Sequence, residues 1–330
     1  KLGKQKLIIT SPAFAEVSQE VELDWGSNQL KDVQLKATGV QVYFQVTDYV
    51  SNQPLKDVNI VYSDYNAKTD DKGNAILVLP KINKDQIEVA VTANSYRDEK
   101  LNIKPVDNPN QSYKQTLTPA KKHAFVSKRS GKYDLYKVDV DGKDEQVVLA
   151  GTGLEKPDSL ALSISPTKNM VAFSSNRDNK RGEDGNLMST LNLVNLDSKE
   201  VKQLAISERI QIIDWFGSRL VYVKISEGSK KDDINRHKIV SYDTQTNKEQ
   251  ELASSNYFND VVVASGSIYY APAAYKVNGN VGLYKINPDG SAKKTVLSNE
   301  VWNLIRSSFE KVSVSVGQDW YELNLANDAM

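Results

Sequence analysis

A stretch of about 48 residues recurs along the second half of this 330-residue chain, and no other feature constrains the fold as strongly. Residues 165–177, SPTKNMVAFSSNR, echo residues 118–129, TPAKKHAFVSKR, with one gap. A repeat of this length is one supersecondary unit that buries its apolar face only against its neighbours. The repeat therefore predicts a scaffold of stacked units, and a scaffold alone does not identify a ligand or partner.

Nearly every ordered segment has the pattern of a β-strand. Apolar and polar residues alternate in residues 40–46 (VQVYFQV) and 311–316 (KVSVSV), which are rich in strand-favouring residue types. Turn signals such as DKGN at 71–74 and NPDG at 287–290 recur every 8 to 12 residues or so. The best helical candidate, residues 300–309, fits a strand with a loop equally well. The sequence predicts an all-β fold.

Alignment on the second strand of each repeat gives five copies, which predict a β-propeller over residues 120–330. The aligned second strands are residues 124–126, 171–173, 220–222, 268–270 and 312–314. A third strand, a polar turn and an outer strand ending in Leu follow in every copy except the last, which lacks the outer strand. We expect about five four-stranded blades.

The sequence leaves the closure of this ring open. Residues 112–118 fit three positions: the missing outer strand, the last strand of the preceding domain, or the inner strand of the first blade. Stacked blades leave strand edges exposed unless one terminus completes the blade of the other. A longer parent protein with six or more blades is a further alternative.

The fullest copy of the repeat carries a distinctive motif. Ser165-Pro166 opens it, a strand follows to Phe173, and SNRD stands at 175–178. This pattern resembles the TolB-like, WD-type repeats of periplasmic and extracellular bacterial proteins, although Thr167-Lys168 replaces the usual Asp-Gly. The resemblance covers about residues 112–330. It implies a β-propeller in an exported bacterial protein.

A second repeat lies in the N-terminal third, where residues 7–14 match residues 89–96 at an offset of 82. The intervening segment has Pro54-Leu55 and then TDDKG at 69–73. Residues 38–119 resemble the carboxypeptidase-regulatory-like family, a small transthyretin-like or immunoglobulin-like (Ig-like) β-sandwich. In that family the module is usually a spacer or docking domain without catalysis.

The TDDKG segment predicts a tight turn between two strands. Asp70 or Asp71 can accept hydrogen bonds from backbone N–H groups of the turn, and Gly73 can adopt a positive φ. The flanking strands are then expected to pair as a hairpin.

Residues 1–37 match only the second half of the sandwich module and are too few to bury a core alone. Either they add strands to the sandwich at 38–119, or the sequence begins partway through a preceding copy. We favour the second alternative, which implies a longer parent protein built of tandem sandwiches.

Composition excludes several classes of function. Lys+Arg and Asp+Glu number 42 each, and this balance argues against general affinity for nucleic acid or for anionic membranes. No apolar run is long enough to span a bilayer, and the chain has no Cys for disulfides or thiolate metal sites. No nucleotide-binding loop or Gly-x-Ser-x-Gly elbow occurs, so we predict no cofactor and no catalytic site.

Candidate metal ligands are few. His123 and His237 have no acidic or His neighbour at a metal-ligand spacing, and both are expected to be solvated or at strand edges. Asp139, Asp141 and Asp144 form a weak calcium candidate, because they place carboxylates at nearly alternate positions. Their place between a third and a fourth strand favours a simple turn instead, so we predict no metal site.

These patterns favour a non-enzymatic, exported modular protein whose sandwich stalk presents a propeller to a protein or glycan at the cell envelope. Contacts are expected from the loops that lead into inner strands. The candidate binding residues are Asp158, Arg209, Asn259, Asp260, Trp302 and Asn303. The mixed-charge insertions at 180–185 and 227–233 are expected to be solvated loops that can also form a binding surface.

Two alternatives remain. The chain could be a structural component of a surface layer or filament, which would require self-assembly. It could also be the non-catalytic propeller part of a larger hydrolase, in which case the full-length parent would be an enzyme. The sequence predicts neither a nucleic-acid partner nor a membrane span, and its location is expected to be periplasmic, extracellular or at the cell surface.

Overall fold

The computed structural model describes residues 2–11, 13–30, 32–108, 110–273, 281–308 and 310–330. Within these ranges the regular elements are β-strands and one short 3₁₀ helix, η1 (Pro157–Ser159), which confirms the all-β prediction. The helical candidate at 300–309 instead contains strand β25 (Val301–Arg306). No helix in the described ranges is long and apolar enough to cross a membrane.

The chain divides into two compact units. The first comprises Lys1–Lys121 and the short segment Asp139–Lys143, and the second comprises Lys122–Val138 and Asp144–Met330. The division after Lys121 lies close to the boundary expected at 119/120. The sequence did not predict that a turn from the first propeller repeat would belong to the first unit.

Two sheets of the first unit share one apolar core. The first sheet has the order β6 (Asn74–Leu79), β3 (Val40–Asp48), β9 (Ser112–Leu117), and the second has the order β5 (Tyr65–Lys68), β4 (Asn59–Tyr62), β7 (Ile87–Thr92), β8 (Glu99–Ile103). Phe44 and Leu77 of the first sheet and Ile60 and Val89 of the second are fully buried in the same cluster. Alternating side chains supply one inward face per sheet, and we call strands β3 to β9 the two-sheet module.

The turn after β5 follows the geometry that the TDDKG motif predicts. Asp70 Oδ1 accepts hydrogen bonds from the backbone N–H groups of Lys72 and Asn74, at 2.9 and 2.8 Å. Gly73 has φ +73°, and a Cβ there would lie 2.4 Å from the carbonyl oxygen of Val46. Only glycine fits this close approach without strain. The predicted roles of Asp70 and Gly73 are confirmed. The expected hairpin is wrong, because β5 pairs with β4 and β6 pairs with β3, so the two strands that flank the turn belong to different sheets.

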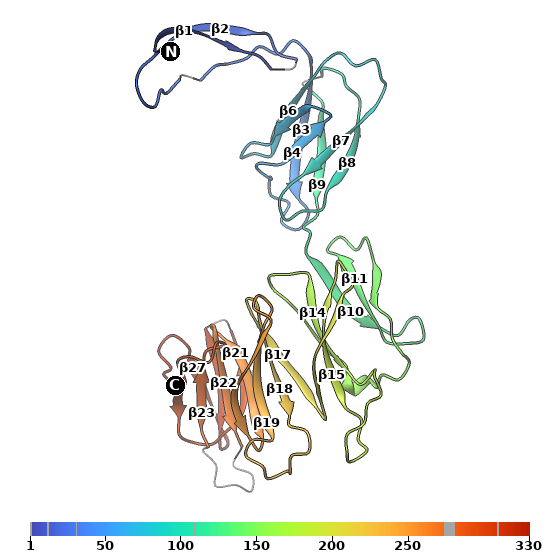
Figure 1. Cartoon of the computed structure of the whole chain (residues 1–330), viewed down its shortest axis with the longest axis vertical. Helices are drawn as coiled ribbons and strands as arrows, with labels where there is room; N and C mark the ends of the chain where they lie inside the picture. The colour runs from blue at the N-terminus through green and yellow to red at the C-terminus, as the bar shows by residue number, and fades with distance from the viewer. Residues whose placement is uncertain (1, 12, 31, 109, 274–280, 309) are drawn as a thin grey trace. The chain divides into compact units, whose positions relative to one another are not determined.

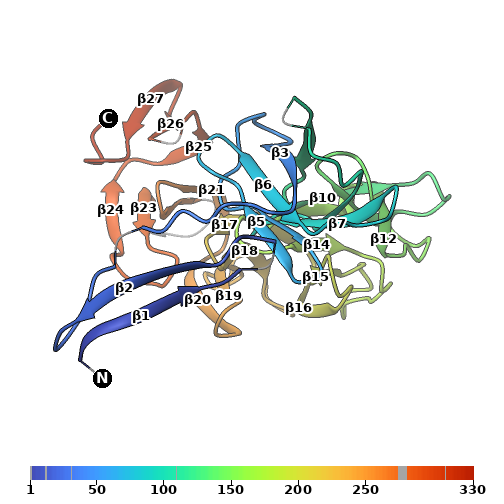
Figure 2. The same cartoon turned by 90° about the horizontal axis from the view of Figure 1, so that it is seen from above.

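The N-terminal residues form a hairpin of β1 (Gly3–Ile9) and β2 (Val17–Leu23), which is a separate two-stranded sheet (Figures 1 and 2). Among the described residues this hairpin adds no strand to either sheet of the two-sheet module. The alternative in which residues 1–37 extend the following sandwich is therefore wrong.

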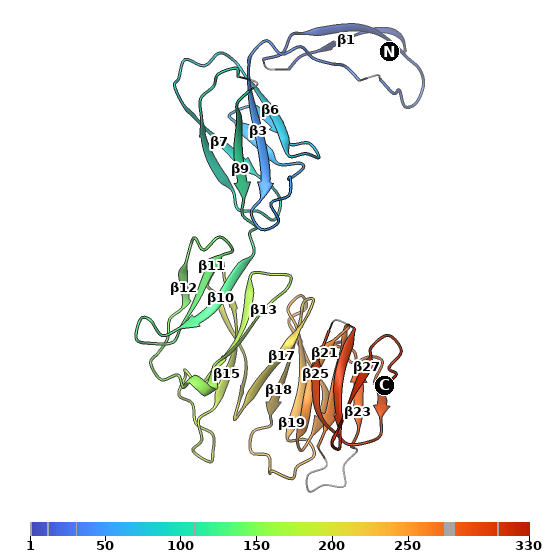
Figure 3. The same cartoon turned by 180° about the vertical axis from the view of Figure 1, so that it is seen from behind.

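The second unit contains a row of five antiparallel sheets among its described residues, and each strand pairs with the next one along the chain. Sheet 1 has β10 (Lys122–Ser127), β11 (Asp134–Asp139) and β12 (Gln146–Leu149), and sheet 2 has β13 (Ala161–Ile164), β14 (Met170–Ser175), β15 (Ser189–Asn195) and β16 (Val201–Ser207). Sheet 3 has β17 (Ile210–Phe216), β18 (Arg219–Ile225), β19 (His237–Asp243) and β20 (Lys248–Ser255), and sheet 4 has β21 (Phe258–Ala264), β22 (Ser267–Pro272), β23 (Leu283–Ile286) and β24 (Lys294–Leu297). Sheet 5 has β25, β26 (Lys311–Val316) and β27 (Asp319–Asn324). Figures 1 and 3 show the sheets in chain order, with sheets 1 and 5 at opposite ends of the row. This is the blade plan of a β-propeller.

The number of strands corrects one detail of the sequence prediction. Sheets 2 to 4 have four strands each, whereas sheets 1 and 5 have three in the described part of the chain. The missing outer strand of the last repeat was expected. Whether the first repeat has an inner strand was left open by the sequence, and the described residues show none, because residues 112–117 form β9, which pairs in parallel with β3. Of the three positions considered for this segment, the last strand of the preceding domain is the one that the structure shows.

Neighbouring sheets enclose separate apolar clusters because their side chains alternate between the two faces. Leu220 and Tyr222 of sheet 3 belong to the cluster shared with sheet 2, whereas Val221 and Val223 belong to the cluster shared with sheet 4. Trp215 of β17 packs toward sheet 2, and its indole Nε1 donates a hydrogen bond to the carbonyl of Ser163 at 3.1 Å.

Candidate functional site

Three inner strands carry a β-bulge, at the second residue of β21 and of β25 and at the fourth residue of β17. In β17, β21 and β25 one residue has no partner on the second strand of its sheet. The unpaired residues are Ile213, Asn259 and Trp302. A bulge turns its residue away from the regular alternation of the strand. Two of the six predicted binding residues, Asn259 and Trp302, are therefore bulge residues.

Asn259 and Asp260 link the inner strands of sheets 4 and 5. The Asn259 amide donates a hydrogen bond to the carbonyl of Val301 at 2.8 Å. Asp260 accepts from its neighbour Val261 N at 2.8 Å with one oxygen and from Leu304 N at 2.9 Å with the other. Both side chains were predicted to bind a ligand, and in the structure each already binds backbone of this chain.

A pocket of about 200 Å³ lies between sheets 3 and 4, at the start of their inner strands. Its lining is Arg209, Gln211, Val223, Ile225, His237, Tyr257, Phe258, Asn259, Asp260 and Val261. We call it the sheet 3–4 pocket. Its volume is below that of sites for drug-sized ligands, so it suits a single side chain or small group. Three predicted binding residues, Arg209, Asn259 and Asp260, meet here.

His237 is the first residue of β19 and is half-buried in the wall of this pocket. Its Nδ1 lies 2.5 Å from the carbonyl oxygen of Asn256, and its ring meets that of Tyr257 edge-on, with the centroids 5.2 Å apart. Because a carbonyl only accepts, Nδ1 carries the proton and Nε2 is an acceptor. His123 is exposed on β10, as expected for a solvated histidine, whereas His237 stands at the start of its strand and is half-buried.

Burial lowers the pKa of His237, and the nearby positive charges of Arg236 and Arg209 lower that pKa further. The hydrogen bond to Asn256 and the negative charge of Glu208 act in the opposite direction, but the first effects prevail. The ring is therefore neutral in the neutral pH range. It can present Nε2 as a hydrogen-bond acceptor to a group in the pocket.

Arg209 stands between β16 and β17 with an exposed side chain. Among the described residues its guanidinium has no hydrogen-bonding or ion-pair partner. The hydroxyl of Tyr257 and the amide of Gln211 likewise have no partner within the described ranges. A guanidinium presents a planar set of donors that matches a carboxylate or phosphate. The pocket thus combines one unpaired cation with neutral hydrogen-bonding groups and with the carboxylate of Asp260, which is already bound by backbone N–H groups.

A second hollow, of about 510 Å³, lies beside the mixed-charge insertions. Its lining comes from residues 182–188 and 227–231, together with Glu208 and Arg236. Arg236 pairs with Glu208 at 2.7 Å and donates to the carbonyl of Ser229 at 2.5 Å. Residues 208–209 and 236–237 are adjacent in the chain, so this hollow borders the sheet 3–4 pocket.

The other predicted binding residues lie elsewhere. Asp158 is in η1 and exposed, and Asn303 is exposed on β25 next to the bulge residue Trp302, which is 49% exposed. None of these three lines the sheet 3–4 pocket in the described part of the chain. Of the six binding residues predicted from loop position, three therefore lie together in the sheet 3–4 pocket and three do not.

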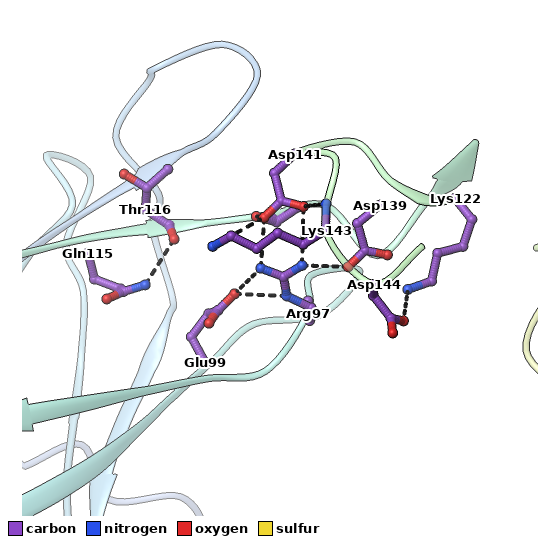
Figure 4. Close-up of polar contacts among 10 residues, drawn as sticks. Arg97, Glu99, Gln115, Thr116, Lys122, Asp139, Asp141, Lys143 and Asp144 are labelled. Atoms are coloured by element: carbon purple, nitrogen blue, oxygen red, sulfur yellow. Dashed lines mark hydrogen bonds and ion pairs between the residues drawn. The ribbon is translucent and has the colours of Figure 1, made fainter. Parts of the chain in front are cut away.

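The weak calcium candidate is occupied by a side chain of the first unit. Arg97 donates to Asp139 at 2.5 Å and to Asp141 at 2.9 Å, and it also binds Glu99 at 2.7 Å (Figure 4). Asp144 instead forms an ion pair with Lys122, at 3.7 Å. The three carboxylates therefore do not converge on one point, and no group of three potential metal ligands exists within the described residues.

Sequence reasoning missed His237, Tyr257 and Gln211. Gln211 alternates with Arg209 along the start of β17, and that alternation could have placed both side chains on one face. Tyr257 and His237 had no such signal, because they meet only through the packing of β19 beside the chain that leads into β21.

No family model and no curated protein matches the chain. Solved structures that resemble it include the β-propeller domain of the Trilobed protease from Pyrococcus furiosus, with 14% identity and a TM-score of 0.41 over 86% of this chain and 82% of that one. TolB from Acinetobacter baumannii has 12% identity and a TM-score of 0.37 over 81% and 75%. An oligogalacturonate lyase in complex with manganese has 11% identity and a TM-score of 0.38 over 97% and 96%. At these TM-scores the likenesses assign neither a family nor an activity to this chain.

Proposed function

We propose that this chain is a non-enzymatic, exported binding protein whose sheet 3–4 pocket receives a carboxylate side chain or chain terminus of a protein partner. One observation carries the proposal: the unpaired guanidinium of Arg209 at a pocket whose other polar groups are neutral or already bound. A carboxylate can accept two hydrogen bonds from a guanidinium, and Gln211 and Tyr257 supply further donors.

The surroundings of the pocket support a polypeptide as the ligand. The adjoining hollow is lined by charged loops that carry both signs, including Glu183, Lys230 and Lys231. Interfaces of this kind bind by a small buried anchor and a polar rim. The seated carboxylate would be the anchor, and flanking residues of the partner would lie along the loops.

The two-sheet module would serve as the spacer of this protein. Its two sheets, its shared core and its TDDKG turn support the resemblance to the carboxypeptidase-regulatory-like sandwich. The exported or cell-surface location is proposed from the two resemblances in sequence alone.

A phage-displayed library of linear peptides tests the binding proposal. The wild-type chain is expected to enrich peptides with Asp, Glu or a free C-terminal carboxylate, and Arg209→Gln is expected to lose this enrichment. Lys56→Gln is the matched control, because Lys56 is an exposed cation in the first unit, far along the chain from the pocket. Equal enrichment by wild type and Arg209→Gln would contradict the proposal.

The same proteins on a glycan array test the other ligand class. Glycan binding that depends on Arg209, without peptide enrichment, would replace the protein partner by a glycan. Hydrolysis of peptide substrates by the wild-type chain would overturn the non-enzymatic proposal.

A further inference from the structure

The N-terminal hairpin repeats the second half of the two-sheet module, pair for pair. Strands β1 and β2 pair with the register of β7 and β8, shifted by 82 residues. The corresponding pairs are Gln5↔Val21 with Ile87↔Ile103, Leu7↔Gln19 with Val89↔Leu101, and Ile9↔Val17 with Val91↔Glu99. A register this closely matched is a property of the backbone and does not follow from the short sequence match alone.

The loops after the first strand of each hairpin also correspond. Ala13 and Ser95, 82 residues apart, both adopt the left-handed conformation, with φ of 62° and 67°. The next residue forms an isolated bridge in each case, Phe14 with Ala37 and Tyr96 with Pro119. Backbone hydrogen bonds of 2.8 Å follow at the same offset, from Ala15 N to the Lys36 carbonyl and from Arg97 N to the Thr118 carbonyl. The described residues of 2–37 therefore have the backbone plan of the corresponding described residues of 84–119.

The two copies differ in what covers them. In the module, β4 pairs with the second edge of β7, and β3 pairs in parallel with β9. Within the described residues β1 pairs only with β2, and residues 30 and 32–35, which correspond to positions of β9, form no strand. Val89 and Leu117 are fully buried, whereas their counterparts Leu7 and Leu35 remain partly exposed.

We propose that residues 2–37 are a half-module, and that its apolar face and the open edge of β1 receive a complementary half with the plan of β3 to β6. The repeat identifies the occupant, because in the two-sheet module strands β3 to β6 cover the corresponding face and edge of residues 84–119. A second copy of this chain cannot supply it without exposing its own β7 to β9. A two-stranded hairpin alone is marginally stable in water, so the missing half also accounts for how this segment is held folded. The inference is independent of the binding function proposed above.

The predicted change on docking is specific. Residues 30–35 become a strand that pairs in parallel with the strand equivalent to β3, and the edge of β1 gains the partner equivalent to β4. Backbone amides that form ladder hydrogen bonds are protected from exchange with solvent. Protection of these two segments is therefore the signature of the completed module.

A fusion protein tests the proposal with sequence from the chain itself. Residues 38–82 are placed directly before residue 1, which restores the spacing of the complete module because residue 1 corresponds to residue 83. Hydrogen exchange with mass spectrometry then compares the fusion with the unfused full chain. We expect amides of residues 3–9 and 30–35 to exchange about tenfold more slowly or better in the fusion.

Two further fusions make the result decisive. In the first, Ile60→Asp in the added copy alone places a charge in the core and should abolish the new protection. In the second, Gln5→Ile and Gln19→Leu give the hairpin the side chains found at 87 and 101, and thus replace the two Gln residues that stand where the module has apolar side chains. Unchanged exchange of residues 3–9 and 30–35 in both this matched fusion and the simple one, with residues 40–117 still protected, would overturn the proposal.

Discussion

The carboxylate of Asp214 and the guanidinium of Arg306 lie 3.7 Å apart, although a complete sheet separates their strands in the row. Asp214 belongs to β17 of sheet 3 and Arg306 to β25 of sheet 5. A flat stack of sheets would keep these side chains apart by the thickness of sheet 4, because stacked sheets lie about 10 Å apart. The inner strands of sheets 3 to 5 therefore converge on a common axis, as blades of a propeller do.

Chemical cross-linking of D214C/R306C tests this convergence. The natural chain has no Cys, so the two introduced thiols are the only targets. A short bifunctional maleimide is expected to join them in high yield, as read by mass spectrometry of the linked peptides. In the control D214C/E322C the second thiol lies on β27. This strand is two strands further out than β25 in the same sheet, which moves the thiol about 10 Å from the position of Arg306. Equal yields in the two variants would contradict the convergence of the inner strands.

Asp260 is expected to stabilise the second unit through its two backbone contacts. Asp260→Ala leaves the N–H groups of Val261 and Leu304 without these acceptors, which costs about 1–3 kcal/mol. Urea unfolding followed by Trp fluorescence measures the loss, since Trp215 is buried in this unit. The control Asp158→Ala removes an exposed carboxylate of the same unit and should change the unfolding free energy little. An equal effect of the two substitutions would show that the backbone hydrogen bonds of Asp260 do not stabilise the second unit.

Local sequence patterns were sufficient to predict the sheets of the second unit. The second strands of the repeats carry apolar residues on both faces, as in Leu220 to Tyr222, because each sheet packs between two others. The turn chemistry of Asp70 and Gly73 is similarly local, since the groups that satisfy it lie within a few residues or on the adjacent strand. Such features depend on spacing along the chain, which a single sequence contains.

Features set by distant pairing could not be predicted. Residues 112–117 fit three positions in sequence, and only their parallel register with β3 decides between them. The bulges at Asn259 and Trp302 arise from the pairing of two strands, and no residue pattern marks them. Asp139 and Asp141 suggested a weak calcium site because Arg97, their actual partner, lies more than 40 residues earlier in the chain.

The lowered pKa of His237 predicts a loss of stability in mild acid. The ordinary pKa of a histidine, 6.5, applies to the unfolded chain, and burial beside Arg236 and Arg209 lowers it in the folded state. The unfolded chain therefore binds the proton more readily, so the contribution of His237 to stability falls as the pH drops below about 6.5. Glu208, the nearby acid, reduces this effect without reversing it.

Comparison of wild type with His237→Asn isolates that contribution. Urea unfolding at about pH 7.5 and about pH 5.5 should show a steeper loss of stability for the wild type, because the variant has no group that titrates at this position. His123→Asn is the control, since His123 is exposed, and it should keep the wild-type dependence on pH. Parallel pH dependences of wild type and His237→Asn would contradict the assignment.

Arg97 is expected to stabilise the folded conformation of the turn at residues 139–143. The side chains of Asp139 and Asp141 are only 1% and 5% exposed, and both carboxylates are bound by its guanidinium, whose pKa they raise. Arg97→Ala leaves two buried negative charges without this partner, a change that costs about 3–5 kcal/mol for buried pairs. Hydrogen exchange should show faster opening of residues 139–143, with partial recovery in Arg97→Ala/Asp141→Asn, which removes one of the charges.

Lys56→Ala breaks a solvent-exposed ion pair with Asp71 in the same unit and should leave this exchange unchanged. If Arg97→Ala behaves like Lys56→Ala, the two aspartates are held by the turn itself and the guanidinium is dispensable.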